Sequence, residues 1–187
     1  MRASLGMTSV LLALLSFAVR ADSWLPPSVR HYPSATSGHV FIVEPNLMSG
    51  AVAEFPKGRL VTASGELVWE RRLLNEVAPV SALVSADARF VVTFDNWQAV
   101  GYGRHVLVIY DADGQLIRSL TLSDIVGASG VKRFRASIGS RWWAGEHHFE
   151  SPQVLALQVY AEGSSIIDAQ PRFDIVRVRL QDGAVLP

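Results

Sequence analysis

Apolar residues along the chain either alternate with polar ones or fill short continuous runs. The segments Phe90–Phe94, Val106–Tyr110 and Val154–Tyr160 are nearly unbroken apolar runs, as expected of strands covered on both faces. In Ile175–Leu180 apolar residues instead alternate with arginines, which indicates a strand with one face in solvent. Since the spacing is two rather than about 3.6 residues and turn residues interrupt it regularly, the pattern predicts an all-β fold.

An internal repeat organises this pattern. The hairpin-like stretch Leu60–Val68 matches Ile109–Ile117 without gaps at an offset of 49 residues (60 to 109), with a glycine at the same turn position. At the same offset, Phe41–Val43 matches Phe90–Val92. A period of this length is typical of blade-like β repeats. We therefore expect four-stranded antiparallel units.

A third copy is looser. Val154–Tyr160 takes the position of Phe90–Phe94, and Asp174–Val185 takes the position of the hairpin, with Gly183 at its turn. Extra sequence lies before this copy, roughly over residues 123–150. The expected units are roughly residues 22–76, 77–125 and 126–187 of one domain, 22–187.

The motifs S-A-D-A-R-F-V-V-T (85–93) and V-I-Y-D-A-D-G (108–114) resemble blades of WD-repeat-like and related β-propellers. The Trp-Asp dipeptide and Gly-His start of true WD repeats are absent, and Ala88 replaces the usual turn glycine. The resemblance implies a propeller-like fold and leaves activity open. Because closed propellers usually have about four to eight blades, three units predict an open arc, an arc completed by a partner, or a meander closing into a sandwich.

A second copy of the chain is one candidate partner. Two three-bladed arcs would give six blades, and apolar faces left exposed at the ends of each arc would drive the association. We therefore expect either a homodimer or a partner protein that completes the β assembly. Size-exclusion chromatography with light scattering distinguishes these states from a monomer.

The first 21 residues have the pattern of a signal peptide. Arg2 precedes an apolar run, Leu5–Val19, and Val19-Arg20-Ala21 is a small-x-small motif suited to signal peptidase. The run is shorter than the roughly 20 residues of a membrane-spanning helix, although an uncleaved anchor is the alternative. We expect cleavage after Ala21 and a secreted or periplasmic protein without stable membrane insertion.

Charge and cysteine content exclude several classes of site. Loss of Arg2 and Arg20 leaves 15 basic and 17 acidic residues, a net charge of −2, so no global field attracts nucleic acid. The chain has no cysteine, which excludes disulfides, thiol catalysis and thiolate metal sites. After the leader, residues 22–37 contain three prolines and are expected to form an extended lead-in, with Trp24 docked on the body.

The first candidate site lies in the loop after Phe94. Asp95, Asn96 and Trp97, followed closely by Tyr102 between two glycines, offer a carboxylate, an amide and two aromatic rings to a polar or sugar-like ligand. The alternative is structural: Asp95 and Asn96 hydrogen-bond the loop backbone, and Trp97 packs on the rim of the sheet.

The second candidate site combines cations with aromatic rings. Arg133, Arg135, Arg141, Trp142 and Trp143 offer charge and stacking to an anionic polymer, glycan or partner protein. If residues 132–138 form a strand, however, the arginines are only its solvated face. Phe134, Ala136 and Ile138 would then face inward.

A third group is the only metal candidate in the sequence. On a strand, Glu146, His148 and Glu150 point the same way, and carboxylate with imidazole suits zinc. Three ligands from one strand would be strained, so a solvated edge is the favoured interpretation. Residues 111–114, Asp-Ala-Asp-Gly, lack calcium-loop spacing and are interpreted as a hairpin turn. We expect no cofactor.

Standard catalytic motifs are missing: there is no nucleophile elbow, no zinc-protease motif, no phosphate loop and no dinucleotide fingerprint. The favoured function is an exported, non-enzymatic binding or interaction module of β-propeller type. The alternative is a small hydrolase or lyase with a polar site at the propeller axis. The enzyme hypothesis requires a pocket in which carboxylates and histidines converge.

Overall fold

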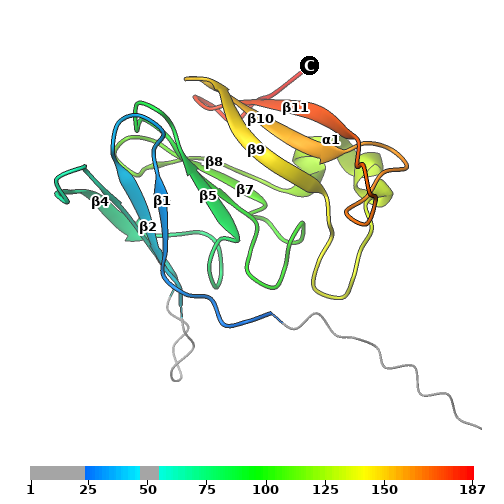
Figure 1. Ribbon diagram of the computed structural model, residues 1–187, viewed down its shortest axis with the longest axis horizontal. Coiled ribbons are helices and arrows are strands. Elements are labelled where there is room, and N and C mark those ends of the chain that lie inside the picture. The colour runs from blue at the N-terminus through cyan, green and yellow to red at the C-terminus, as the bar shows by residue number, and fades with distance from the viewer. Residues whose placement is uncertain (1–23, 47–54) are drawn as a thin grey trace, which may run out of the picture.

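The computed structural model describes residues 24–46 and 55–187, which form three four-stranded antiparallel sheets, none closed into a barrel. Figure 1 shows the three sheets spread like a fan. Sheet 1 contains β1 (Arg30–Pro33), β2 (Val40–Glu44), β3 (Lys57–Val61) and β4 (Leu67–Arg72). Sheet 2 contains β5 (Ser81–Val84), β6 (Val91–Phe94), β7 (Leu107–Tyr110) and β8 (Leu116–Leu120). Sheet 3 contains β9 (Ala144–Ser151), β10 (Val154–Tyr160), β11 (Phe173–Arg179) and β12 (Val185–Leu186).

The predictions of an all-β fold and of repeated four-stranded antiparallel units are therefore confirmed. In each sheet the strands pair in sequence order, as in a meander. The expected signal peptide, residues 1–21, lies outside the described residues. Among those that are described, no helix has the length and apolar character to cross a membrane.

Sheet 2 lies between the other two sheets and is buried on both faces. Val91 and Val108 belong to the apolar cluster shared with sheet 1, whereas Val92 and Ile109 belong to the cluster shared with sheet 3. All residues of β6 and β7 are buried. This two-sided packing explains the continuous apolar runs and confirms the prediction that these strands are covered on both faces.

The repeat is confirmed for the last hairpin of sheets 1 and 2 and corrected for the strand before it. Leu60 and Ile109 each pair with the residue nine positions later, on β4 and β8, so these hairpins are equivalent at the predicted offset of 49 (60 to 109). Phe41 pairs with Leu60, whereas Val92 pairs with Ile109, which makes the offset between β2 and β6 51 residues (41 to 92). A two-residue slip keeps every side chain on its face, so the apolar pattern does not reveal it.

The segment expected to be an extended lead-in contains the first strand of sheet 1. β1 pairs with β2 and also contacts sheet 2: Arg30 Nη1 donates to the Val80 carbonyl at 3.1 Å, and Ser34 Oγ donates to the Ser85 carbonyl at 3.1 Å. Pro33 is tolerated because β1 is an edge strand, where a missing N–H breaks no ladder. Of the three prolines that suggested a lead-in, Pro33 is therefore compatible with a strand, whereas Pro26 and Pro27 precede β1.

A helical insertion joins sheets 2 and 3. Thr121 caps helix α1 (Leu122–Gly130) in a capping box with Asp124, and the 3-10 helix η1 (Val131–Arg133) follows. The strand considered for residues 132–138 is wrong, because this segment folds back on itself: Trp142 N donates to the Arg135 carbonyl at 3.0 Å. Ile138 is 95 % exposed rather than buried.

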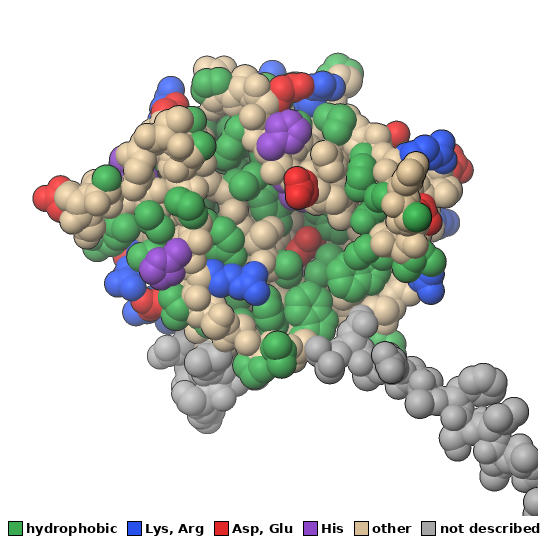
Figure 2. All heavy atoms as spheres, in the orientation of Figure 1, with side chains coloured by type: hydrophobic (Ala, Val, Ile, Leu, Met, Phe, Trp, Pro, Cys, Tyr) green, Lys and Arg blue, Asp and Glu red, His purple; other side chains and the backbone are tan. Residues whose placement is uncertain are grey.

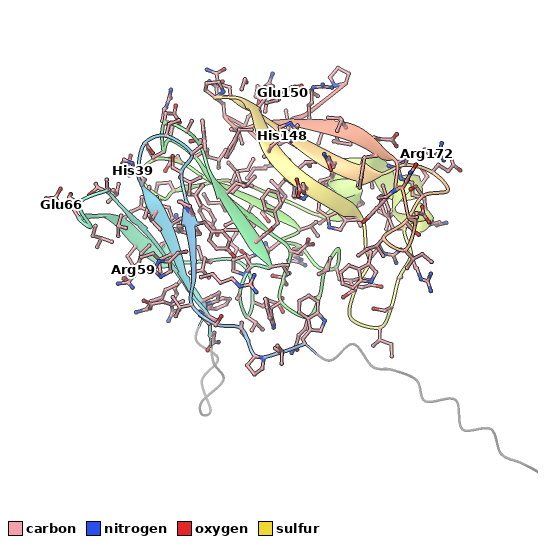
Figure 3. All side chains as sticks on the ribbon, in the orientation of Figure 1. His39, Arg59, Glu66, His148, Glu150 and Arg172 are labelled. Carbon is pink, nitrogen blue, oxygen red and sulfur yellow. The ribbon has the colours of Figure 1, made fainter. Side chains whose placement is uncertain are left out.

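The two outward faces of the assembly carry ion pairs. On sheet 1, Arg59 contacts Glu44 and Glu70 on the neighbouring strands, and Figure 3 labels Arg59 on this sheet. On sheet 3, Arg177 makes two hydrogen bonds to Glu150, at 2.7 and 2.8 Å. The outer face of each terminal sheet is therefore charged, in contrast to both faces of sheet 2.

Candidate functional site: a tryptophan-lined cavity between two sheets

A cavity of about 450 Å³ lies between the first strands of sheets 2 and 3, β5 and β9. Figure 2 shows a hollow in the middle of this face, with hydrophobic and acidic side chains around it. Its lining by described residues is mostly apolar and includes three ionisable side chains, none of them Lys or Arg. Its residues are Trp24, Val80, Ser81, Ala82, Leu83, Phe94, Asp95, Val100, Trp142, Trp143, Ala144, Gly145, Glu146, His147 and Ile166.

Asp95 is the buried carboxylate of this cavity. The residue is 6 % exposed, and its Oδ1 accepts a hydrogen bond from Gly101 N at 2.7 Å. Trp143 Nε1 donates to the same carboxylate, 3.1 Å from Oδ2. Burial raises the pKa of the Asp95 carboxyl from 3.8 to about 7, although these two hydrogen bonds oppose the rise. Near neutral pH the group is therefore able both to hold and to release a proton.

The backbone of the loop fixes the position of this carboxylate. Asp95 has a positive φ of 57°, a conformation that Asp adopts more readily than most residues. Asn75, which is fully buried, donates to the Asp95 carbonyl at 2.7 Å and accepts from Thr93 Oγ1 at 2.9 Å. Asn96 Oδ1 accepts from Glu76 N at 3.1 Å. Asn96 therefore stabilises the loop, as the structural alternative for this residue predicts.

His147 of β9 lies against the aromatic wall of the cavity. Its ring centroid is 4.5 Å from that of Phe94 and 5.2 Å from that of Trp143. Burial lowers the pKa of His147 from 6.5 to about 4, so the imidazole is neutral at physiological pH. Its Nδ1 is buried without a hydrogen-bond partner.

Replacing His147 with Phe is expected to stabilise the protein by about 1 kcal/mol at pH 7, because it removes a buried polar atom that makes no hydrogen bond. The measurement is the free energy of unfolding in urea. His148→Phe is the matched control: His148 is exposed on the opposite face of β9, where a substitution changes stability by less than about 0.5 kcal/mol. Equal effects of the two changes would contradict the buried position of His147.

A second, more open cavity of about 510 Å³ adjoins the first and shares Trp24 and Trp142 with it. Trp97 forms part of its wall, and its Nε1 donates to the Leu25 carbonyl at 3.1 Å. The Arg30 guanidinium lies 5.0 Å from the centroid of the Trp97 ring. This cavity therefore contains a cation that the chain itself supplies.

The predicted group of cations and aromatics is divided between different places. Only Trp142 and Trp143 line the cavity. Arg133 forms an ion pair with Asp174 at 3.3 Å. Arg141 Nη1 donates to the Val131 carbonyl at 3.0 Å and the guanidinium lies over Tyr102. Arg135 is exposed and lines neither cavity. Tyr102, from the first candidate site, also lines neither cavity, and its Oη donates to the Ser137 carbonyl at 3.1 Å.

The three residues considered for a metal lie on the exposed face of β9. Glu150 is paired with Arg177, which holds the pKa of its carboxyl below the usual range. Figure 3 labels His148 and Glu150 on β9, and Glu146 lies at the rim of the cavity. Within residues 24–46 and 55–187, no group of three or more His, Asp or Glu side chains is placed to hold a metal ion.

Sequence reasoning missed two residues of the site. Trp24 was expected only to dock the lead-in, yet it lines both cavities and meets Trp97 edge to face, with centroids 5.1 Å apart. His147 was not among the sequence candidates, because the metal hypothesis for this strand concerns Glu146 and His148, which point the other way. The alternation on β9 contains the missing signal: if Glu146 and His148 face solvent, His147 faces the core.

No family model and no curated protein matches this chain. Among solved structures, a chain from the crystal structure of the eukaryotic initiation factor is similar, with a TM-score of 0.49 and 13 % sequence identity. The match covers 86 % of this chain and 32 % of that chain, so this chain spans about a third of that chain's length. The proposed function therefore rests on the geometry of the cavity.

Proposed function

We propose that this protein is an exported, non-enzymatic binding module, built from three β-propeller-type blades, that takes its ligand in the cavity between sheets 2 and 3. One observation carries the proposal: four of the chain's five tryptophans line this cavity or the adjoining one. Tryptophan is enriched where binding energy is concentrated, because it contributes a large apolar surface with few rotatable bonds.

The size and lining of the cavity support the same proposal. Small-molecule sites are typically concavities of about 300–1,000 Å³ with mostly apolar walls and a few polar groups that orient the ligand. The cavity has about 450 Å³, with the polar residues Ser81, Asp95 and His147 in its lining and Glu146 at its rim. The indole of Trp143 is fixed by its hydrogen bond to Asp95, so part of the site is preorganised.

The test is a fragment screen by ligand-observed NMR on the chain without residues 1–21. We expect hits that compete for one site and bind at least about tenfold more weakly to Trp142→Ala, a loss of about 1.4 kcal/mol. Leu116→Ala is the control, because Leu116 is exposed on β8 and lines neither cavity. Hits that are insensitive to Trp142→Ala, or an absence of hits, would contradict the proposal.

A specific observation keeps the enzyme alternative as a second candidate. Asp95, with a pKa of about 7, and His147 line the same cavity, and a carboxylate that titrates near neutral pH suits general acid–base catalysis by a hydrolase or lyase. Mass spectrometry of bound compounds distinguishes the candidates. A binding module releases its ligand unchanged, whereas an enzyme converts it in a reaction that Asp95→Asn abolishes.

We also propose that a partner, either a second copy or another protein, completes the β assembly. The driving force for this association differs from the exposed apolar faces expected from the sequence. The outer faces of sheets 1 and 3 carry charged side chains, so contacts through them would be electrostatic and sensitive to salt. The cavity itself is formed by residues of one chain.

A further inference from the structure

We propose that the cavity between sheets 2 and 3 binds an organic cation, a quaternary ammonium or protonated amine attached to an apolar body, with Asp95 as its counter-ion. This inference rests on the proposed function and specifies the ligand class. Three features of the part of the chain that the structure describes carry it: a buried carboxylate without an opposing charge, walls of tryptophan, and a lining without Lys or Arg.

Asp95 has no counter-ion among residues 24–46 and 55–187. Its carboxylate accepts hydrogen bonds from Gly101 N and Trp143 Nε1, both uncharged donors. Among the ion pairs of the described residues, none includes Asp95. Burial of an ionised carboxylate without an opposing charge is unfavourable. A cation bound in the cavity supplies that charge, and this electrostatic gain is available to no neutral or anionic ligand.

The aromatic walls favour the same ligand class. Indole rings attract cations through the negative potential of their faces, and aromatic cages recognise quaternary ammonium groups in this way. Trp24, Trp142 and Trp143 line the cavity; Trp24 and Trp142 are partly exposed, whereas Trp143 is buried. In the adjoining cavity the same kind of wall already holds a cation, since the Arg30 guanidinium lies 5.0 Å from the Trp97 centroid. The cavity between sheets 2 and 3 has indole rings and the Asp95 carboxylate, but its described lining residues include no Lys or Arg.

The polar side chains exclude the opposite charge. Asp95 and Glu146 repel anions, and His147 adds no positive charge because its pKa is lowered to about 4. The volume of about 450 Å³ leaves room beside a cationic head group for apolar atoms, and Val80, Leu83 and Ile166 provide apolar surface for them. A cation with an apolar body fits both properties of the cavity.

The test compares choline with 3,3-dimethyl-1-butanol, its neutral isostere in which carbon replaces the charged nitrogen. Both are titrated by isothermal calorimetry into the chain without residues 1–21. We expect choline to bind at least about tenfold more tightly than the isostere. Asp95→Asn should weaken choline at least about tenfold and change the affinity for the isostere by less than about twofold, because Asn preserves the shape and removes the charge.

Two outcomes overturn the inference. If the two compounds bind equally to the wild-type chain, charge does not contribute to binding. This comparison needs no variant, so it remains valid even if Asp95→Asn fails to fold. Choline binding that persists in a folded Asp95→Asn variant removes the counter-ion. If the isostere binds with sensitivity to Trp142→Ala and without any preference for the cation, the binding module stands and the cation inference fails. Insensitivity of both compounds to Trp142→Ala overturns both.

Discussion

Asp95→Asn is expected to remove one pH-dependent contribution to the free energy of unfolding. The contribution of Asp95 falls by roughly 4 kcal/mol between acid and neutral pH. Burial raises the pKa of Asp95 from 3.8 to about 7, so the folded protein holds this proton more tightly than the unfolded chain. The free energy of unfolding therefore falls as pH rises from about 4 to about 7 and is constant above. Each pKa unit corresponds to about 1.4 kcal/mol, which gives the total.

His147 produces the opposite slope. Its pKa is lowered from 6.5 to about 4, so the folded protein favours the neutral ring, and this group's contribution to stability is lost as pH falls from about 6.5 to about 4. Over this window the contributions of Asp95 and His147 nearly cancel in the wild-type protein. Asp95→Asn should expose the rising slope of His147, and His147→Phe should expose the falling slope of Asp95, each at most about 1.4 kcal/mol per pH unit.

Urea unfolding of the three proteins between pH 4 and 9 measures these slopes. Asn is the suitable replacement because it tolerates the positive φ of 57° at this position and retains an oxygen for the Gly101 N–H. Exposed carboxylates contribute equally to all three proteins and cancel in the differences. An Asp95→Asn protein with the wild-type pH profile would show that the carboxylate is already neutralised or solvated.

Gly101→Ala is expected to destabilise the protein by about 3 kcal/mol or more. Gly101 has φ +69°, and an added Cβ would lie 2.7 Å from the Arg141 carbonyl oxygen. The left-handed backbone costs a residue with a side chain about 1–2 kcal/mol, and a clash with backbone adds about 1–3 kcal/mol. The measurement is the change in free energy of unfolding in urea.

Gly65→Ala is the matched control for this prediction. Gly65 also has a positive φ, +86°, but no atom lies within 4 Å of its added Cβ. Gly65→Ala should therefore lower the free energy of unfolding only by the cost of the left-handed backbone, about 1–2 kcal/mol. If the two variants lose equal stability, the loop containing Gly101 is less tightly packed against Arg141 than described.

The sequence predicted the architecture because period-two alternation and turn glycines report directly on strands and hairpins. The offset of 49 located the hairpin equivalence of Leu60 and Ile109, which the pairing across β3–β4 and β7–β8 confirms. It could not locate the slip between β2 and β6, since a shift of two residues leaves the pattern of buried faces unchanged. β1 was missed because the prolines of residues 22–37 are typical of loops, although a proline such as Pro33 is also tolerated in an edge strand.

The candidate site was predicted in part. Asp95, Trp142 and Trp143 were all identified as candidates, in two separate groups, and the structure brings them to one cavity. Sequence spacing gave no indication of this convergence, because it depends on the packing of sheet 2 against sheet 3. For Asn96 and Arg133 the sequence allowed either a ligand-binding or a structural role. In the structure Asn96 accepts a hydrogen bond from Glu76 N and Arg133 pairs with Asp174, and the sequence indicates neither partner.

The contrast between the sheets has a consequence for the organisation of the chain. The inner strands of sheet 2, β6 and β7, are buried throughout, whereas sheets 1 and 3 are each charged on the side turned away from it. This is the cap–internal–cap arrangement of linear repeat proteins, in which terminal repeats with a polar outer face keep a stack soluble. In those terms sheets 1 and 3 each present a polar outer face, formed by the charged ladders of β2–β4 and β9–β11.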